Sequence, residues 1–344
     1  MIDDDLEKAR DSILTTARRI ISLGPICDSC LGRQFAMLAT GFTNAERGRS
    51  LKSVMAMQAS ANEDRAFLEE LAPSFLPARL KLGRKGEDDA PCSVCLGEMA
   101  PANLDLWAER AASALNGWDY RTLLVGTLMS GLLAENEELI VADGGSLHAE
   151  PFKSELNREV GKRLSALVGK SVDLKSPDMV VHLNLEKGEV QLQVSSIFIR
   201  GRYRKLVRGI PQTRWPCREC RGRGCQRCEG TGRMYQESVD ELIRPAVMQA
   251  AGAEDTVFHG AGREDIDARM LGSGRPFIVE AVRPRIRKID LALLEQEICR
   301  QAEGKVEVTG LAWADSAMVE RLKEAAFEKT YSALIRLGGQ VAEE

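Results

Sequence analysis

Apolar residues recur at helical spacing through much of the chain. Leu6–Leu23 carries them three or four positions apart and stops at Gly24-Pro25, which predicts an amphipathic helix. Asp290 and Asp315 are N-cap residues in front of two later helices. The same spacing predicts helices at Leu31–Leu38, Leu51–Leu71, Leu104–Leu115, Lys153–Leu167, Tyr235–Ala251, Leu291–Ala302 and Ser316–Phe327.

Strands are predicted where short apolar stretches lie between turn residues. These stretches are Arg121–Val125, Glu138–Ala142, Met179–Leu185, Val190–Arg200, Thr256–His259, Pro276–Val282, Lys305–Ala312 and Lys329–Arg336. A chain with helices and strands in segregated layers belongs to the α+β class. A length of 344 residues allows two or three domains.

Composition and charge change this picture in one place. The net charge of −4 argues against a nucleic-acid partner, but residues 200–233 hold ten arginines and one lysine against two glutamates. A compact basic zone on an acidic body fits a polyanionic partner, and the alternative is a solvated basic loop. No apolar run has the length of a membrane span and the first residues are acidic, so we expect a cytoplasmic protein without membrane contact.

Eight of the nine cysteines form Cys-x-x-Cys pairs, a spacing typical of metal ligands inside the cell. Cys217, Cys220, Cys225 and Cys228 lie in two tandem copies of Cys-x-x-Cys-x-Gly-x-Gly, in which each pair offers two thiolates to a structural Zn²⁺. The other ligand candidates are Cys27, Cys30, Cys92 and Cys95, and 61 residues separate these two pairs, so the spacing leaves open whether they share one zinc ion. The ninth, Cys299, is expected to be a buried inert thiol.

The segment just before the tandem cysteines interleaves arginines with aromatic residues. Arginine and lysine bind phosphates, which makes Arg202, Arg204, Lys205 and Arg208 candidate RNA contacts. Tyr203 and Trp215 can stack on unpaired bases, and the alternative for Trp215 is packing against the metal site.

A second candidate site is the acidic stretch Arg263-Glu264-Asp265-Ile266-Asp267, which lies between two predicted strands. Its residue types fit three interpretations: a Mg²⁺-binding cluster, a catalytic carboxylate with an arginine partner, or an exposed turn. The basic residues that follow the second strand (Arg283, Arg285, Arg287 and Lys288) could reach a phosphate backbone.

The stretch Phe258–Phe277 resembles the active-site motif of the archaeal and eukaryotic tRNA pseudouridine synthases that act on the T-loop uridines, positions 54 and 55. Segments elsewhere resemble the same family in the same order, and together they span essentially the whole chain. They are Cys27–Ala36, Phe152–Lys162, Arg200–Trp215 and the tandem cysteine segment.

The resemblance implies a THUMP-containing, zinc-binding RNA-binding region at 1–205, a zinc segment at 206–235 and the first part of a catalytic domain with a mixed sheet at 236–344. It implies catalysis on the T arm of tRNA without a cofactor or a catalytic metal. The family's aspartate follows an arginine by two positions, which selects Asp265 after Arg263 as the nucleophile and leaves Asp267 as second choice. Arg269 belongs to the same motif, and Tyr331 sits where the family has a tyrosine that packs against the base.

Family members continue past the end of this sequence with a second half of the catalytic domain. The expectation is therefore a pseudouridine synthase or the N-terminal portion of one, and the alternative is a tRNA-binding module that does no chemistry alone. The second half then comes from a separate polypeptide, or this sequence is a fragment of a longer one. A THUMP-bearing thiolase or methyltransferase is disfavoured because neither a phosphate-binding glycine loop nor a dinucleotide fingerprint is present. A zinc-knuckle chaperone would not account for the Asp265 loop.

Overall fold

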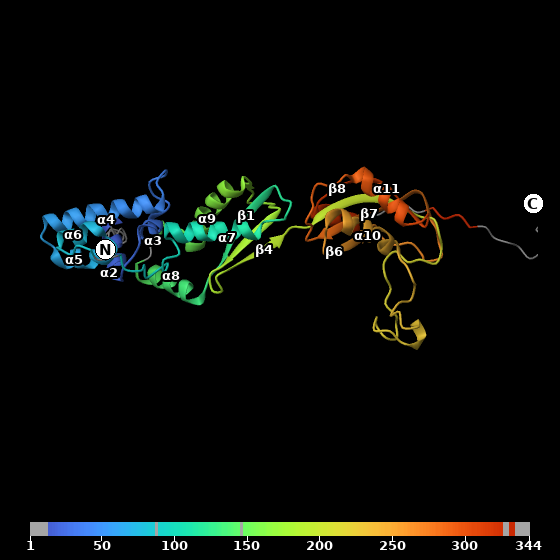
Figure 1. Cartoon of the computed structure of the whole chain (residues 1–344), viewed down its shortest axis with the longest axis horizontal. Coiled ribbons are helices and arrows are strands. Elements are labelled where there is room, and N and C mark those ends of the chain that lie inside the picture. The colour runs from blue at the N-terminus through green and yellow to red at the C-terminus, as the bar shows by residue number, and fades with distance from the viewer. Residues whose placement is uncertain (1–12, 87–88, 145–146, 326–329, 334–344) are drawn as a thin grey trace, which may run out of the picture. The chain divides into compact units, whose positions relative to one another are not determined.

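The computed structural model describes residues 13–86, 89–144, 147–325 and 330–333. Contacts divide the chain into two compact units, Met1–Val194 and Ser195–Glu344. Each unit has its own hydrophobic core, and Figure 1 traces their elements in chain order. No helix among the described residues has the length and apolar character needed to cross a bilayer.

The first unit begins with a group of helices. They are α2 (Ile13–Ser22), α3 (Asp28–Gly32), α4 (Asn44–Ala61), α5 (Arg65–Leu71) and α6 (Leu76–Lys81). Thr43 starts α4 with a capping box, in which its hydroxyl accepts from the Glu46 amide and the Glu46 carboxylate accepts from the Thr43 amide. The Asp64 carboxylate caps α5 by accepting from the Phe67 amide, and positive φ at Glu63 breaks the helix predicted over Leu51–Leu71 into two.

The rest of the first unit is a sheet with helices. Its elements are α7 (Pro101–Ala114), β1 (Thr122–Leu128), α8 (Gly131–Gly144), α9 (Phe152–Val168), β2 (Ser171–Val172), β3 (Met179–Asn184) and β4 (Glu189–Val194). The strand order is β2-β1-β3-β4, with β1 parallel to both neighbours and β4 antiparallel to β3. Helix α9 packs on β1 and α7 packs on α9, so both helices contribute to the core beside the sheet.

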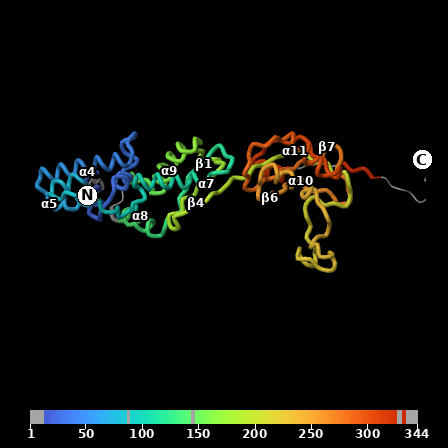
Figure 2. The backbone as a smooth tube through the Cα atoms, viewed as in Figure 1, coloured from blue at the N-terminus to red at the C-terminus, as the bar shows by residue number. Residues whose placement is uncertain are grey.

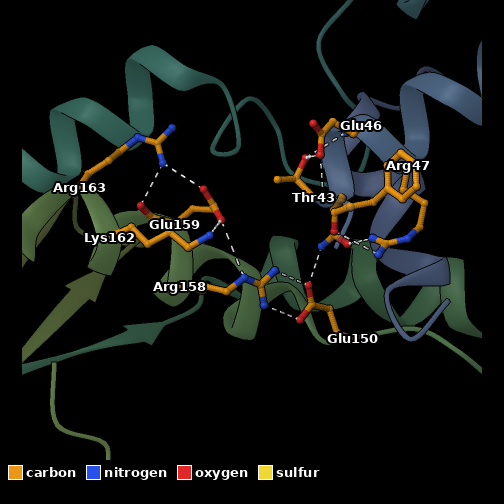
Figure 3. Close-up of polar contacts among 10 residues, drawn as sticks. Thr43, Glu46, Arg47, Glu150, Arg158, Glu159, Lys162 and Arg163 are labelled. Atoms are coloured by element: carbon orange, nitrogen blue, oxygen red, sulfur yellow. Dashed lines mark hydrogen bonds and ion pairs between the residues drawn. The ribbon is translucent and has the colours of Figure 1, made fainter. Parts of the chain in front are cut away.

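A network of charges connects α9 to the start of α4. Arg158 of α9 donates two hydrogen bonds to the Glu150 carboxylate, at 2.7 and 2.6 Å, and Asn44 donates to the same carboxylate at 2.5 Å. Arg47 in turn donates to Asn44. Figure 3 shows Arg158 and Glu150 facing each other below α4. The helical part and the sheet of this unit are therefore joined by polar contacts as well as by a continuous apolar core.

The second unit contains β5 (Ile197–Lys205), α10 (Val239–Ala251), β6 (Asp255–Gly260), β7 (Met270–Val282), α11 (Leu291–Gln301), β8 (Val306–Ala314) and α12 (Ser316–Glu324). Its strands are ordered β6-β7-β5-β8, and their described pairings are antiparallel. Helices α10 and α11 contribute apolar residues to one core with alternate residues of the strands. Asp290 and Asp315 cap α11 and α12, as the sequence predicts.

The α+β class is confirmed, but several predicted elements are wrong. Glu138–Ala142, expected as a strand, lies inside α8, because Leu133, Glu137 and Ile140 recur at helical spacing with Leu133 and Ile140 in the core. Leu31–Leu38 contains only the end of α3 and a short 3₁₀ turn, Arg33–Phe35.

The predicted strand Val190–Arg200 is two strands in different sheets. β4 ends at Val194 and β5 starts at Ile197, where the chain passes from the first unit to the second. β5 thus belongs to the second unit, although its residues precede the expected boundary at 205. The three-part division at 205 and 235 stays a prediction.

Two expected elements fall partly outside the described residues. Of the helix Leu6–Leu23, only positions from Ile13 onward are described, as α2. Of the strand Lys329–Arg336, only 330–333 are described, and these four form no strand.

Candidate active site and metal centres

The acidic stretch forms a loop between paired strands, as the sequence predicts. β6 and β7 pair from Asp255↔Val282 to Gly260↔Phe277, and residues 261–269 connect them. Asp265, Asp267 and both flanking arginines, Arg263 and Arg269, are exposed on this loop. An exposed carboxylate on such a loop is accessible to a substrate, and the two paired strands hold both ends of the loop in place.

The loop has a buried anchor at Glu264, whose side chain is directed into the unit and leaves the residue 8% exposed. Its carboxylate accepts a hydrogen bond from the Tyr203 hydroxyl at 2.8 Å and pairs with Arg275 Nε at 3.0 Å. Lys205 Nζ lies 3.8 Å from its other oxygen. Burial and the Glu264 charge raise the pKa of Tyr203, so the phenol stays protonated and donates.

Lys205, expected as an RNA contact, is inside the protein. It is 0% exposed, and its ammonium donates to the carbonyls of Ile210, Asp265 and Ile266 at 3.0, 2.9 and 3.1 Å. Burial lowers its pKa, and the neighbouring carboxylates oppose that shift. All three N–H donors therefore have backbone acceptors, and none is available to a phosphate.

The other basic candidates of this segment stay near the surface. Arg202 donates to the carbonyls of Ser273 and Gly274, each at 2.7 Å, which ties β5 to the first half of β7. Arg204 forms an ion pair with Glu307 of β8. Arg208 is exposed just after β5. Their contact with RNA stays a prediction.

Arg263 and Trp215 join the loop to the cysteine segment. The Arg263 guanidinium lies over the Trp215 ring at 5.4 Å, and Trp215 meets Tyr235 edge to face at 5.8 Å. Trp215 is half-buried at the base of that segment, which favours the packing interpretation of this residue.

Tyr331, the predicted base-packing residue, is 71% exposed in the described stretch 330–333. Nothing in its surroundings assigns it a role, so that role stays a prediction.

The tandem cysteines converge on one centre. The sulfurs of Cys217, Cys220, Cys225 and Cys228 lie within 4.8 Å of one another, with individual Sγ–Sγ separations of 3.7 to 3.9 Å. The amides of Gly224 and Gly232 donate to Cys220 Sγ and Cys228 Sγ, both at 3.2 Å. Figure 2 shows the segment extending from the sheet as a loop of its own.

Glycine is required at the crossing of this loop. A Cβ on Gly232, where φ is +68°, would lie 2.3 Å from the Gly222 carbonyl oxygen, and one on Gly224 would lie 2.7 Å from that of Gly230. The two Cys-x-x-Cys turns can therefore approach closely only with glycine at these positions.

The two earlier pairs meet as well, which their spacing did not decide. The sulfurs of Cys27, Cys30, Cys92 and Cys95 lie within 4.8 Å of one another, with Cys27 Sγ 3.8 Å from Cys95 Sγ. The buried Arg33 donates to Cys30 Sγ at 3.4 Å. Both tetrads could hold a metal ion, and neither leaves a ligand position open for catalysis.

The sequence gives Glu264 and Arg275 no role beneath the loop. It offers Tyr203 as a residue that stacks on a base, and this is wrong, because Tyr203 is fully buried and donates to Glu264. A signal was present in β5, where two sets of side chains alternate along the strand and lie on opposite faces. One set is Ile197, Ile199 and Tyr203, and the other is Arg200, Arg202 and Arg204. That alternation places Lys205 on the buried face, but the basic composition of the run concealed it.

Comparison with known proteins finds two matching families. The family described as "Pus10, C-terminal" matches residues 198–344, and "Pus10 THUMP domain, archaeal" matches residues 107–184, which run from α7 to β3. The expected THUMP domain is thereby confirmed.

Curated relatives are similar along nearly the whole chain. A protein of Methanothrix thermoacetophila named tRNA pseudouridine synthase Pus10 is 61% identical over 335 residues, which are 96% of this chain and 74% of the relative. Proteins with the same name are 41% identical in Halorubrum lacusprofundi, over 96% of this chain and 74% of the relative, and 40% identical in Methanopyrus kandleri, over 92% and 74%.

Proposed function

This chain belongs to the tRNA pseudouridine synthase Pus10 family, and we propose that it is an isomerase that converts T-loop uridines of tRNA, positions 54 and 55, to pseudouridine. Asp265 is the nucleophile. The observation that carries the assignment is an exposed aspartate on a loop held by buried charges beneath it.

The first step of the chemistry needs a nucleophilic carboxylate, which such a loop offers. The Asp265 carboxylate attacks the nucleoside, the bond between N1 of uracil and C1′ of ribose breaks, and a bond between C5 and C1′ replaces it. The hydrogen on C5 leaves as a proton and N1 acquires one, so no electron or atom is gained overall. The uridine must leave its stack to reach the carboxylate, which is easier in a loop than in a duplex.

RNA binding is assigned to both units. The THUMP domain of the first unit supplies one contact, and the basic zone at 200–233 supplies the other. Arg263 and Arg269 flank the nucleophile in the sequence and are exposed, and we assign them to phosphates near the flipped uridine. A cytoplasmic location stays a prediction.

We assign Zn²⁺ to both cysteine tetrads. Four thiolates at about 2.3 Å from a tetrahedral zinc ion lie about 3.8 Å apart, and the observed separations are 3.7 to 3.9 Å. A disulfide would need about 2.05 Å. The zinc ions would be structural: one would fix the helical part of the first unit, and the other would hold the cysteine segment beside the catalytic loop.

Tritium release from tRNA labelled at C5 of the T-loop uridines tests the function. Asp265→Asn keeps the side-chain shape and removes the nucleophile, so we expect release to fall by a factor of about 10⁴ or more. Asp267→Asn, the matched change at the second candidate, should keep release within about tenfold of the unaltered chain.

Tight tRNA binding with no release by the unaltered chain would identify a binding module instead. Loss of release in Asp267→Asn but not in Asp265→Asn would move the nucleophile to Asp267.

A further inference from the structure

We infer that Glu264 and Lys205 are positioning residues. They connect the catalytic loop (residues 261–269) to the arginine-rich segment (residues 200–215), and so they set the place of the Asp265 carboxylate. The inference rests on the proposed role of Asp265. Neither residue touches the substrate, because both are buried.

The cluster beneath the loop contains three charged groups and one phenol. Glu264, Lys205 and Arg275 are each at most 8% exposed, and Tyr203 is fully buried among them. Burying charges costs free energy that apolar packing would avoid, unless each charge is paired. Here the carboxylate has Arg275 at 3.0 Å and the Tyr203 hydroxyl at 2.8 Å. Such a cluster favours this arrangement of the loop, because withdrawal of Glu264 would leave the buried charge of Arg275 without this partner.

Lys205 connects two segments that are distant in the sequence. Its ammonium binds Ile210 in the arginine-rich segment and both Asp265 and Ile266 in the catalytic loop. The Asp265 carbonyl is thus fixed by a charge-assisted hydrogen bond at the residue that carries the nucleophile.

Further bonds join the same two segments. The Gly209 amide donates to the Ile266 carbonyl at 2.9 Å, and Gln212 Nε2 donates to the Gly262 carbonyl at 2.9 Å and to the Tyr203 hydroxyl at 2.8 Å. Several hydrogen bonds therefore connect residues 205–212 to residues 262–266.

Close packing leaves these two segments little freedom. A Cβ on Gly260 would lie 2.6 Å from Gln212 Nε2, and one on Gly274, where φ is +73°, would lie 2.7 Å from the Tyr203 carbonyl oxygen. Gly260 ends β6 and Gly274 lies within β7, so these close approaches occur on the two strands that flank the loop. The segment that carries the exposed Arg208, a candidate RNA contact, thus also holds the loop that carries the nucleophile.

Two variants test the inference. Lys205→Met preserves the length of the side chain and removes the ammonium, and Glu264→Gln preserves the shape and removes the charge. Lys305→Met is the control, because Lys305 forms an ion pair with Glu237 at 2.7 Å outside this cluster. The measurements are tRNA affinity, the single-turnover rate of tritium release and amide hydrogen exchange of the full chain.

We expect faster exchange at the amides of Gly209 and Ala268, which donate to the Ile266 and Asp265 carbonyls, while the amides of α10 stay protected and show that the unit is folded. The single-turnover rate should fall about 100-fold in both variants, because a displacement of about 1 Å at a reacting group has that effect. Affinity for tRNA should change by less than about threefold, and Lys305→Met should match the unaltered chain.

Unchanged exchange at Gly209 and Ala268 would overturn the inference, whatever the activity. So would faster exchange with an unaltered single-turnover rate, since the loop would then move without effect on Asp265. An unaltered chain that releases no tritium contradicts the proposed function instead, and the exchange data still decide whether these residues hold the loop.

Discussion

Glu155 of α9 is a carboxylic acid enclosed in the first unit, where it is 2% exposed. Burial raises its pKa to about 7 from an ordinary value of 4.5, against the opposing effects of Asn44 and Arg33. Between these two pH values the folded protein retains a proton that the unfolded chain has lost. The contribution of Glu155 to stability is therefore complete below pH 4.5 and is lost as the pH rises to about 7.

Glu155→Gln removes this dependence, because the amide is neutral at every pH. We expect the variant to match the unaltered chain near pH 4.5 and to be more stable at pH 8 by up to about 3 kcal/mol. Urea unfolding followed by tryptophan fluorescence, to which the buried Trp107 of the first unit contributes, measures the difference. Glu138→Gln, at an exposed position of α8, is the control and should show no such trend. If the stability of the two variants depended on pH in the same way, the raised pKa of Glu155 would not be the source of the pH dependence.

At the scale of elements, the sequence predicts what local rules decide. The N-caps Asp290 and Asp315 mark the starts of α11 and α12, and the loop around Asp265 falls between two strands. Glu138–Ala142 fails because a short apolar run fits a helix as well as a strand, and the packing of the whole unit decides between them.

The candidate site likewise contains features that the local sequence predicts and features that only the packing of the unit determines. Spacing alone marks the eight cysteines as ligand candidates, because each pair is a local pattern. The resemblance to the family, and not the residue types alone, selects Asp265. The cluster of Glu264, Lys205 and Arg275 depends on contacts between β5, β7 and the loop, which no local pattern specifies. Lys205 shows the limit most clearly, since composition assigns it to the surface and strand alternation assigns it to the interior.

The cysteine segment allows a test with a built-in control. Cys228→Ser removes one of four ligands, so we expect bound zinc to fall from two ions per chain to one. Limited proteolysis should then cut within 216–233, while α10 stays intact. Cys299→Ser should keep two ions, because Cys299 lies outside both tetrads and exchanges weak hydrogen bonds with Val308. The assignment is wrong if metal analysis finds an equal zinc content in the two variants.

At the scale of the whole molecule, we expect RNA binding to depend on where the charges lie and not on the net charge of the chain. A chain of net charge −4 gains little from general attraction to RNA, so we expect the salt-dependent part of its affinity to come from the local charge of +9 at residues 200–233. Affinity that depends on released counterions falls linearly with the logarithm of the salt concentration.

Neutralising exposed arginines of that zone should therefore reduce the salt slope in proportion. For Arg214, Arg218 and Arg227 changed together to glutamine, we expect the slope of log K against log salt to become shallower by about 2 to 3. Three exposed cations elsewhere, Arg65, Lys81 and Arg300, changed in the same way remove the same total charge. They should leave the slope nearly unchanged, as titrations of labelled tRNA at several salt concentrations would show. Equal reductions in the two triple variants would mean that net charge, and not the basic zone, controls RNA binding.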